Sequence, residues 1–547
     1  MHSSSFLRIF ILFVACVLFL WNDVCAHQRA GASQNVGAHV LTFAQSTPRI
    51  RSSDLSIRRP SYRTNAARNK LGMAFPLENI LDKVPVPKSI VRILGIGAAA
   101  VGFGKWGLGG FQGFQSQDGL DRIRGGSGKL SAGRTQTEML FGSTKNDGEK
   151  KKILILMSDT GGGHKASALS LEAAMKIAFP GKIEVDIVDI WTDYGAYPYN
   201  KFVPGYQFLA KNPVLWKAFW EYGRFPLSRI FSEQTSNLAC HDSFRSCIEK
   251  YNPDLIISVH PLCQDLPLRC LKNIGGGKRQ IPFVTVVTDL GGAHPTWFDK
   301  RVDQCFVPSN ALYKIAKKCG LRDDQITQHG LPIREGFWKE TASKPTLRKK
   351  LGLKNDDKTV LVVGGGDGVG GLLNVAETLI ERLGQNNQKS QVVVVCGKNE
   401  AVKTTLSTKK HPENVNVVVN GFVTNMDEWM GAVDCIVTKA GPGTIAEAAI
   451  KGLPCMLSAY LPGQEEGNIP YVIDGGYGDF STNPKKIANT ISYWLQDPEL
   501  LSTMSANAKA DGKPNATMNI AKDIGNNFLF NNNMSNSKKK PVLASVK

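Results

Sequence analysis

The 547-residue sequence predicts an α/β protein made of two Rossmann-like domains that face each other across a cleft. Two observations lead to this prediction. Short, nearly continuous apolar segments alternate with helical stretches, a pattern typical of strands buried on both faces of a parallel sheet. The alternation also occurs twice, in residues 151–340 and in residues 341–527, and each half has about the length of one such domain.

The first half begins at Lys152 with an apolar strand, a glycine turn at residues 161–163 and a helix that carries His164 in its first turn. Its later strands are predicted in the segments IEVDIVDI, DLIISVHP, FVTVVTDL and CFVPS. Residues 331–345 contain two prolines and form the linker to the second half. Ligands of open α/β sheets bind at the carboxyl ends of the strands, so the cleft between the halves is the predicted ligand site.

The second half repeats the pattern, and its strands are predicted in TVLVVGGGDGVGGL, QVVVVCGKN, VNVVVNGF, DCIVTKAG and PCMLSAY. One helix is expected to begin near residue 370 and another to span residues 444–451. For the last helix of this half, a return to the first domain is one expected arrangement.

The N-terminal segments have the composition of targeting signals. Residues 1–26 combine an early Arg8, an apolar run and small residues at the end, which is typical of a secretory signal peptide. Residues 27–75 hold eight Lys or Arg against one acid, Asp54, which is typical of an organelle transit peptide. Together they predict a protein of the plastid envelope that arrives through the secretory pathway. The alternative is a disordered extension on a secreted protein.

Two further segments are expected to be poorly ordered: the Gly-rich residues 76–150 and the basic tail, residues 528–547. These basic ends explain part of the formal charge of +19, and the sequence has no aromatic RNA-binding strand or basic recognition helix. We therefore expect no nucleic-acid partner. The nine cysteines beyond residue 26 include no C-x-x-C pair, so we expect no disulfide framework and no structural zinc.

The turn at residues 439–443, between a buried strand and a helix, is the strongest ligand-binding signal. Its glycines expose the N-terminus of the helix, where backbone N–H groups suit an anion. Glu447, one turn further on, is placed to accept hydrogen bonds from a ribose diol. Side chains of the types that bind sugar hydroxyls follow in a polar loop: Gln464, Glu465 and Asn468. The set predicts a nucleotide-sugar pocket, although the turn alone is equally typical of a tight strand–helix corner.

An unusual segment at residues 199–231 holds ten aromatic residues and five Lys or Arg against a single acid, Glu221. Aromatic and basic side chains together suit the headgroup boundary of an anionic membrane. We therefore expect Trp216, Trp220 and Arg224 at a membrane surface. The alternative is an excursion that packs on its own domain.

Seven motifs together resemble the monogalactosyldiacylglycerol synthases. In chain order they are DTGGGHKASA (159–168), SVHPL (258–262), TDLGGAHPTWF (288–298), GLPIR (330–334), GGGDGVG (364–370), TKAGPGTIAEA (438–448) and GQEEGNIPYV (463–472). The resemblance implies a GT-B fold and a monotopic enzyme of glycosyltransferase family 28. It also implies inverting transfer of galactose from UDP-galactose to the sn-3 hydroxyl of diacylglycerol. The alternative is a GT-B enzyme that uses UDP-glucose or UDP-N-acetylglucosamine on another lipid.

Two other classes fit the sequence less well. A non-catalytic lipid-binding protein would not need the set of Glu447 and the polar loop. An NAD-linked oxidoreductase would need G-x-G-x-x-G, which the segments GGGHKA and GGGDGVGG do not match.

The resemblance also implies roles for individual residues. His164 is the leading candidate for the base that takes the acceptor proton, and an imidazole suits this task because its ordinary pKa is near 6.5. A capping or structural histidine is the alternative, and Asp289 is the second candidate for the base or for orienting the acceptor. Acceptor binding is expected at loops that contact lipid, which carry His260, His294 and Trp297.

For the donor, the resemblance places the diphosphate between two glycine turns, where backbone dipoles and no essential metal carry the charge. The residues expected around UDP are Gly163, Arg334, Gly364, Gly365, Gly366, Asp367, Gly443 and Thr444, with Phe422 and Val423 over the uracil and Glu447 at the ribose. Gln464, Glu465 and Asn468 would bind the galactose. The oligomeric state stays open, a homodimer included.

This chain departs from the family pattern in four places. Residues 263–265 stand where the family tends to have a second histidine, and residues 291–293, Gly-Gly-Ala, replace a more polar triplet. Asp367 replaces a glutamate, and Glu466 stands where a small residue is usual.

Overall fold

The computed structural model describes residues 150–275, 279–339, 342–364 and 371–530. All of them belong to one compact unit, Gly142–Lys547. The predicted signal peptide, the transit segment and all but the last residue of the predicted Gly-rich linker lie outside the described residues, as does most of the predicted basic tail. Within the described ranges, no helix is both long enough and apolar enough to cross a membrane.

The first sheet has six strands in the order β2-β1-β3-β4-β5-β6, and all neighbours are parallel. Its strands are β1 (Lys151–Met157), β2 (Ile183–Asp189), β3 (Leu255–Ser258), β4 (Phe283–Val286), β5 (Gln304–Val307) and β6 (Ile326–Gln328). The five predicted strands of this half are confirmed. Strand β6 was not predicted, because its three residues are too few to show a pattern.

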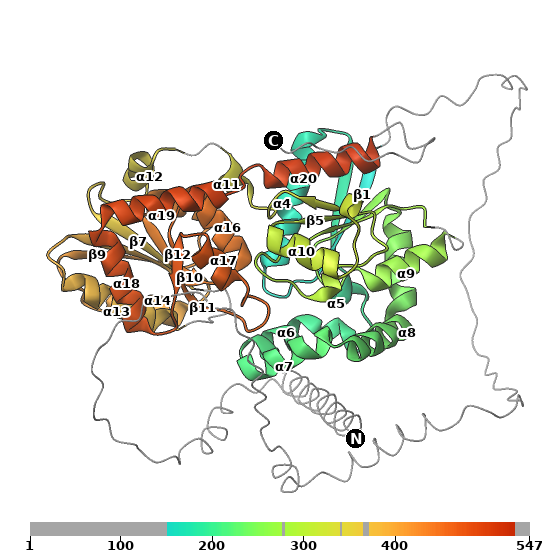
Figure 1. The fold of residues 1–547 in the computed structure, drawn as a ribbon, viewed down its shortest axis with the longest axis horizontal. Coiled ribbons are helices and arrows are strands. Elements are labelled where there is room, and N and C mark those ends of the chain that lie inside the picture. The colour runs from blue at the N-terminus through green and yellow to red at the C-terminus, as the bar shows by residue number, and fades with distance from the viewer. Residues whose placement is uncertain (1–149, 276–278, 340–341, 365–370, 531–547) are drawn as a thin grey trace, which may run out of the picture. The chain divides into compact units, whose positions relative to one another are not determined.

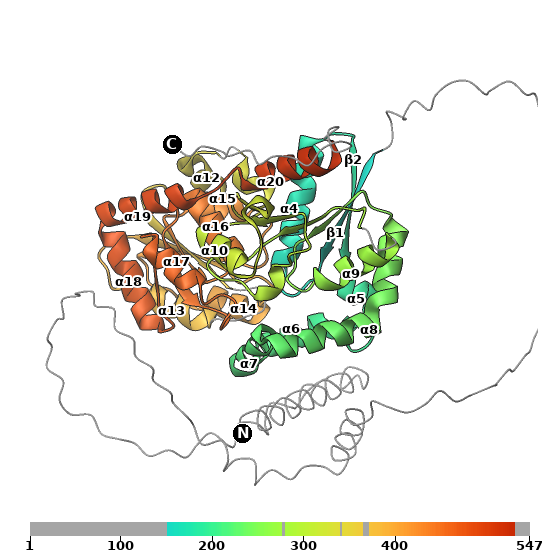
Figure 2. The ribbon, with the colours of Figure 1, turned by 45° about the vertical axis from the view of Figure 1, so that its right-hand side comes forward.

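Helices connect these strands and cover both faces of the sheet. They are α4 (Gly163–Ala178), α5 (Ile190–Tyr194), α6 (Phe202–Ala210), α7 (Pro213–Arg224), α8 (Pro226–Tyr251), α9 (Asp265–Ile274) and α10 (Asn310–Lys318), with the short turns η2 (Tyr199–Lys201), η3 (Pro295–Trp297) and η4 (Asp323–Gln325). Side-chain caps explain two of the starts: Asp189 accepts the N–H of Thr192, and Ser309 accepts that of Leu312. Figure 2 shows α6, α7 and the start of α8 lying together, away from the sheet.

The second sheet is also parallel, with the strand order β12-β11-β10-β7-β8-β9. Its strands are β7 (Lys358–Val363), β8 (Ser390–Val395), β9 (Val415–Asn420), β10 (Cys435–Lys439), β11 (Cys455–Ala459) and β12 (Gly478–Phe480). The helices of this half are α11 (Glu335–Trp338), α12 (Lys344–Lys350), α13 (Leu372–Gly384), α14 (Glu400–Thr408), α15 (Met426–Ala432), α16 (Pro442–Lys451), α17 (Asn468–Asp474), α18 (Pro484–Gln496) and α19 (Pro498–Asp511). The five predicted strands are confirmed, and β12 is a sixth.

Both sheets are buried on their two faces, as their nearly continuous apolar strands predict. Every residue of β3, β4 and β8 is buried. Each sheet separates two apolar clusters, one per face, so the chain folds as two three-layered α/β halves. The predicted fold class is confirmed.

The last helix, α20 (Ala516–Ile524), leaves the second half and packs on the first, followed by the turn η5 (Gly525–Leu529). In Figures 1 and 2 the red α20 lies beside the cyan α4. Ile520, Ala521 and Ile524 have no exposed surface and belong to the apolar cluster that contains residues of β1, β3 and β4. The predicted return of the last helix to the first domain is thus confirmed.

Candidate active site

His164 is held at the start of α4 by a glycine turn. Gly161 and Gly162 have φ angles of 118° and 77°, a region that side chains with a Cβ rarely adopt. This turn places the imidazole against the carboxyl ends of β3 and β4. Its Nδ1 lies 2.9 Å from the carbonyl oxygen of Val259 and 3.0 Å from Oγ1 of Thr288.

These contacts decide which nitrogen of His164 is free. A carbonyl oxygen only accepts hydrogen bonds, so Nδ1 carries the hydrogen and Nε2 carries the lone pair. Burial lowers the pKa of His164 to about 4, although the bond to Val259 and the charge of Asp159 act in the opposite direction. At neutral pH the ring is therefore uncharged, and Nε2 can accept a proton.

His260 supports the ring of His164. The two rings meet edge to face, with centroids 4.5 Å apart. The N–H of Leu262 donates to Nδ1 of His260, so the other nitrogen, Nε2, carries the hydrogen and donates it to Thr160, 3.1 Å away. His260 is 3% exposed, so it packs against His164 inside the domain. The expectation that His260 lies on a loop open to the lipid acceptor is therefore wrong.

Asp289 and Trp297 form a buried pair beside His164. The indole Nε1 of Trp297 donates to Oδ2 of Asp289 over 2.7 Å, and the indole lies 6.0 Å from the His164 ring. Burial raises the pKa of Asp289 to about 7; the bond from Trp297 opposes the shift, and the nearby carboxylate of Glu465 adds to it. Trp297 is fully buried, so its expected place on a lipid-contacting loop is wrong. Its indole N–H finds a partner inside the domain, which permits full burial.

His294 is covered by helix α7. Its Nδ1 lies 2.8 Å from Oγ1 of Thr296, and its ring packs edge to face on Trp220, with centroids 4.8 Å apart. Burial lowers the pKa of His294 to about 4. The segment around Trp220 thus closes over the loop after β4.

The N-terminus of α16 has the properties expected of an anion site. No side chain caps this helix, and a Cβ at Gly443 would meet no atom within 4 Å, so the first turn of the helix borders open space. The side chain of Lys439 lies beside this turn, because a Cβ built on Gly441 would be 3.6 Å from its Cε. The ammonium group of Lys439 pairs with Glu465. Sequence analysis missed Lys439, although its place at the end of a strand before a glycine turn is a usable signal.

Two predicted donor residues pair with each other. Oε1 of Glu447 accepts from Nε of Arg334 at 2.8 Å and from its Nη2 at 2.6 Å. Burial raises the pKa of Glu447, and the Arg334 guanidinium opposes that shift. The pair fixes the side chain of Glu447, one turn inside α16.

The three predicted sugar-binding residues have different surroundings. Glu465 is 4% exposed, and its carboxylate accepts from Lys439 and from the N–H of Leu461. Asn468 is 1% exposed; its Oδ1 accepts the N–H of Gly291 at 2.7 Å, and its Nδ2 donates to the carbonyl of Ala440. Oε1 of Gln464 is buried with no hydrogen-bond partner among the described residues. Asn468 therefore ties the two halves together in this structure, while Gln464 holds a free acceptor.

The remaining predicted donor residues lie at the carboxyl ends of β7 and β9. Phe422 is 73% exposed and Val423 is partly buried. Gly364 ends β7, and a Cβ there would lie 2.7 Å from a methyl carbon of Leu372. Gly365, Gly366 and Asp367 lie outside the described residues.

Both halves of the chain are similar to known proteins. Residues 164–333 match the family described as monogalactosyldiacylglycerol (MGDG) synthase, and residues 359–520 match the glycosyltransferase family 28 C-terminal domain. Monogalactosyldiacylglycerol synthase 1, chloroplastic, of Arabidopsis thaliana is 44% identical over 383 residues, which cover 68% of this chain and 70% of the relative. The chain belongs to the monogalactosyldiacylglycerol synthase family.

Other relatives are similar. The monogalactosyldiacylglycerol synthase of Spinacia oleracea is 44% identical over 383 residues, which cover 68% of this chain and 72% of the relative. Among solved structures, MurG of Acinetobacter baumannii is similar with a TM-score of 0.45 and 15% sequence identity. The matched region covers 68% of this chain and 98% of the MurG chain.

The aromatic segment of this MGDG synthase family member differs from its predicted position. Trp216 is 4% exposed and packs in a small apolar cluster with Leu209 and Leu461, so the expectation that Trp216 meets a membrane is wrong. Trp220 is also partly buried, whereas Arg224 is exposed and pairs with Glu221. The exposed apolar side chains lie instead at the start of α7 and along α8 with its N-cap: Val214, Phe225, Leu227, Ile230, Phe231 and Leu238.

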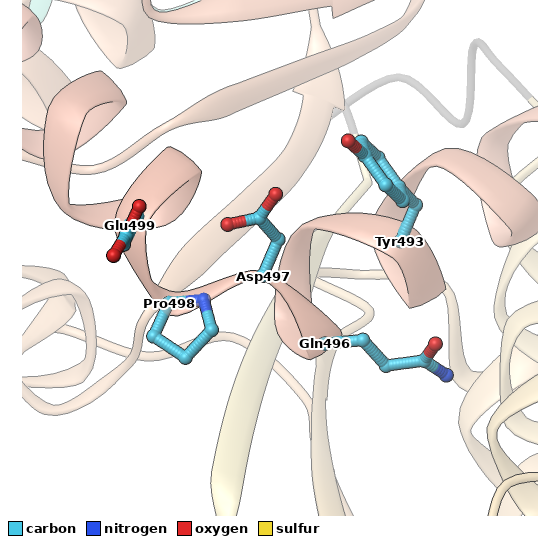
Figure 3. Close-up of a pocket in the computed structure, with 5 residues that line it drawn as sticks. All are labelled: Tyr493, Gln496, Asp497, Pro498 and Glu499. Atoms are coloured by element: carbon cyan, nitrogen blue, oxygen red, sulfur yellow. The ribbon is translucent and has the colours of Figure 1, made fainter.

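A surface depression lies elsewhere on the second half of the chain, at the corner between α18 and α19 (Figure 3). Its lining residues are Tyr493, Gln496, Asp497, Pro498 and Glu499. The carboxylate of Asp497 accepts the N–H of Leu500 at 2.9 Å and caps α19. None of these five residues is a predicted site residue, and their arrangement is explained by the helix cap.

Proposed function

We propose that this chain transfers galactose from UDP-galactose to the sn-3 hydroxyl of 1,2-diacylglycerol, with inversion at the anomeric carbon, and so makes monogalactosyldiacylglycerol. The family membership and the names of the relatives support this activity. The observation that carries the proposal is the hydrogen bond from Nδ1 of His164 to the carbonyl of Val259. It leaves Nε2 as an uncharged base.

The proposed step is a single displacement. The acceptor hydroxyl gives its proton to Nε2 of His164, and its oxygen attacks C1 of galactose from the face opposite UDP. The bond between C1 and the UDP oxygen breaks, so an α-linked donor gives a β-linked product. Asp289 is the second candidate for the base, because burial keeps its pKa close to 7.

For the leaving UDP, we expect the positive end of α16 to stabilise the diphosphate through the N–H groups of Gly443 and Thr444, with Lys439 adding a full charge. The proposal includes no essential metal. Phe422 and Val423 would cover the uracil, and Glu447 would hold the ribose. Gln464 and Glu465 would bind galactose, since Oε1 of Gln464 is a buried acceptor that a sugar hydroxyl can satisfy.

The proposed location is the plastid envelope, with peripheral attachment to an anionic membrane. Both plant relatives named above have the word chloroplastic in their names. The exposed apolar stripe of α8 offers a surface that can enter the headgroup layer, beside helix α7 with its basic residues Lys217 and Arg224.

The test of the base is His164→Ala in the full chain. We expect transfer to fall by about 10²–10⁴-fold, the usual contribution of a positioned acid–base group. Binding of UDP, measured by calorimetry, should stay unchanged because His164 lies outside the α16 turn. Normal turnover in this variant would remove His164 from the proposed role.

The test of the donor compares UDP-galactose, UDP-glucose and UDP-N-acetylglucosamine, each with a radiolabelled sugar, on diacylglycerol vesicles. We expect label in the lipid fraction chiefly from UDP-galactose. A clear preference for another donor would contradict the proposed substrate while leaving the reaction class intact.

A further inference from the structure

Thr288 contacts the proposed base from the second strand end of the site. It follows β4, is 7% exposed, and its Oγ1 lies 3.0 Å from Nδ1 of His164. The carbonyl of Val259, which follows β3, lies 2.9 Å from the same nitrogen. We propose that Thr288 is a positioning residue of the transfer reaction, acting through His164. This inference rests on the proposed function.

The geometry assigns the hydrogen-bond roles. Because Val259 fixes the hydrogen on Nδ1 of His164, the hydroxyl oxygen of Thr288 is a second acceptor for that hydrogen. The shared hydrogen bond sets the orientation of the ring in two directions, one from each strand end. Nε2 is then left as the ring nitrogen that can take the proton of the acceptor hydroxyl.

The same contact acts during the reaction. When Nε2 takes the acceptor proton, the ring becomes a cation, and hydrogen bonds from its Nδ1–H to two oxygens become stronger. Among the described residues no carboxylate is hydrogen-bonded to His164, so neutral oxygens take the role that a carboxylate has in many histidine bases. Removal of one oxygen should therefore slow proton transfer without changing donor binding.

The charged and titratable groups around the ring come from each neighbouring element. Asp159 follows β1 and pairs with Lys165 of α4 at 3.6 Å, His260 meets the ring edge to face, and Asp289 is turned toward Trp297. Each of these groups has its own partner. Thr288 and Val259 alone hold Nδ1 in the described part of the chain.

The strand supplies a matched control. Thr285 lies on β4, has no exposed surface, and its hydroxyl is buried with no hydrogen-bond partner among the described residues. Thr285→Val therefore makes the same chemical change as Thr288→Val, three residues earlier in the chain, but it removes no contact of His164. Thr288→Ser keeps the hydroxyl and removes only a methyl group.

The experiment measures single-turnover rates of the full chain with UDP-galactose and diacylglycerol vesicles. We expect Thr288→Val to lower the rate about tenfold, the loss that one hydrogen bond to a charged group accounts for. The KM for UDP-galactose should change less than twofold. Thr288→Ser should stay within about threefold of the native rate, and Thr285→Val should match it.

Three results would overturn the inference: a native rate in Thr288→Val, an equal defect in Thr288→Ser, or an equal defect in Thr285→Val. The last two would assign the effect to packing. His164→Ala, measured in parallel, keeps the two proposals apart. If it retains turnover, the proposed base is wrong; if it is inactive while Thr288→Val is normal, only the positioning role fails.

Discussion

At the scale of single residues, burial keeps the histidines of the site uncharged. Burial lowers the pKa of His164, His260 and His294, because each ring is removed from water and the nearby charges do not compensate. Their hydrogen bonds then fix which nitrogen carries the hydrogen. Asp289 shows the opposite shift, toward a pKa of about 7, because burial disfavours its charged form.

These opposite shifts predict different pH profiles for the two candidate bases. A base must be unprotonated, so activity falls as pH drops through its pKa. With His164 as the base, kcat/KM should stay level from pH 8 down to about 5, because its pKa is about 4. With Asp289 as the base, kcat/KM would already fall to half near pH 7.

The measurement is kcat/KM for diacylglycerol of the native chain and of Asp289→Asn, over the pH range in which the fold is intact. The Asn variant keeps an oxygen that can accept from Trp297 and should retain the level profile. A midpoint near pH 7 that disappears in Asp289→Asn would identify Asp289 as the base.

At the scale of elements, the loop that precedes α17 is clasped by the first half of the chain. Lys217 on α7 lies 3.2 Å from Glu466, and the indole of Trp220 would lie 2.5 Å from a Cβ at Gly463. The N–H of Gly291 donates to Asn468. Gly291 in the first half and Glu466 in the second are two departures from the family pattern. Both take part in the contact between the first half and this loop.

This contact predicts that Gly291→Ala damages the donor side of the site. A Cβ at Gly291 would overlap the carbonyl of Gly467, so the loop must move and the bond to Asn468 is lost. Overpacking of this kind costs about 1–3 kcal/mol, which corresponds to about 5–150-fold. We expect a loss of that size in kcat/KM for UDP-galactose.

The control for this prediction is the adjacent glycine. A Cβ at Gly292 would lie 3.7 Å from Cα of Gly467, an ordinary van der Waals distance, so Gly292→Ala should be near native. Equal effects of the two substitutions would show that the loop does not depend on this close approach.

Helix α8 carries an exposed apolar stripe that predicts membrane contact. Leu227 and Leu238 are 70% and 89% exposed and lie three turns apart on one face of the helix. We expect Leu227→Ser with Leu238→Ser to lower the partition of the full chain into anionic vesicles about tenfold or more, because each side chain loses apolar burial. Vesicle co-sedimentation measures the partition.

A matched control is Leu169→Ser on α4, where the leucine is 50% exposed but lies on another helix. It should leave the partition unchanged. Equal binding by all variants would assign membrane contact to another surface.

At the scale of the whole molecule, the last described α-helix, α20, packs on the first half. The second half folds around its own sheet, and α20 then lies beside α4 and joins the apolar cluster on that face of the first sheet. Thr517 adds polar contacts, since its hydroxyl donates to the carbonyl of Ile333 and accepts the N–H of the same residue. The first half therefore depends on residues almost two hundred positions further along the chain.

This dependence predicts a large effect of Ile520→Ala. Ile520 has no exposed surface, and removal of its side chain should lower the free energy of unfolding by about 2–5 kcal/mol. Asn519, which is exposed on the same helix, is the control, and Asn519→Ala should change stability by less than about 0.5 kcal/mol. Urea unfolding followed by circular dichroism measures both, and equal stabilities would mean that α20 is not part of the first core.

The sequence by itself determined the two parallel sheets, the glycine turns and the positions of His164, Glu447 and Gln464. Apolar strand patterns and turn glycines act through neighbours in the chain, so they are visible without tertiary contacts. The tertiary structure alone decided that Trp216 and Trp297 are buried, because an aromatic ring suits a membrane boundary and a core equally well. It also decided that Asn468 bonds to Gly291, and that Thr288 and Lys439 join the site. Each of these depends on a partner far away in sequence, which composition and spacing do not identify.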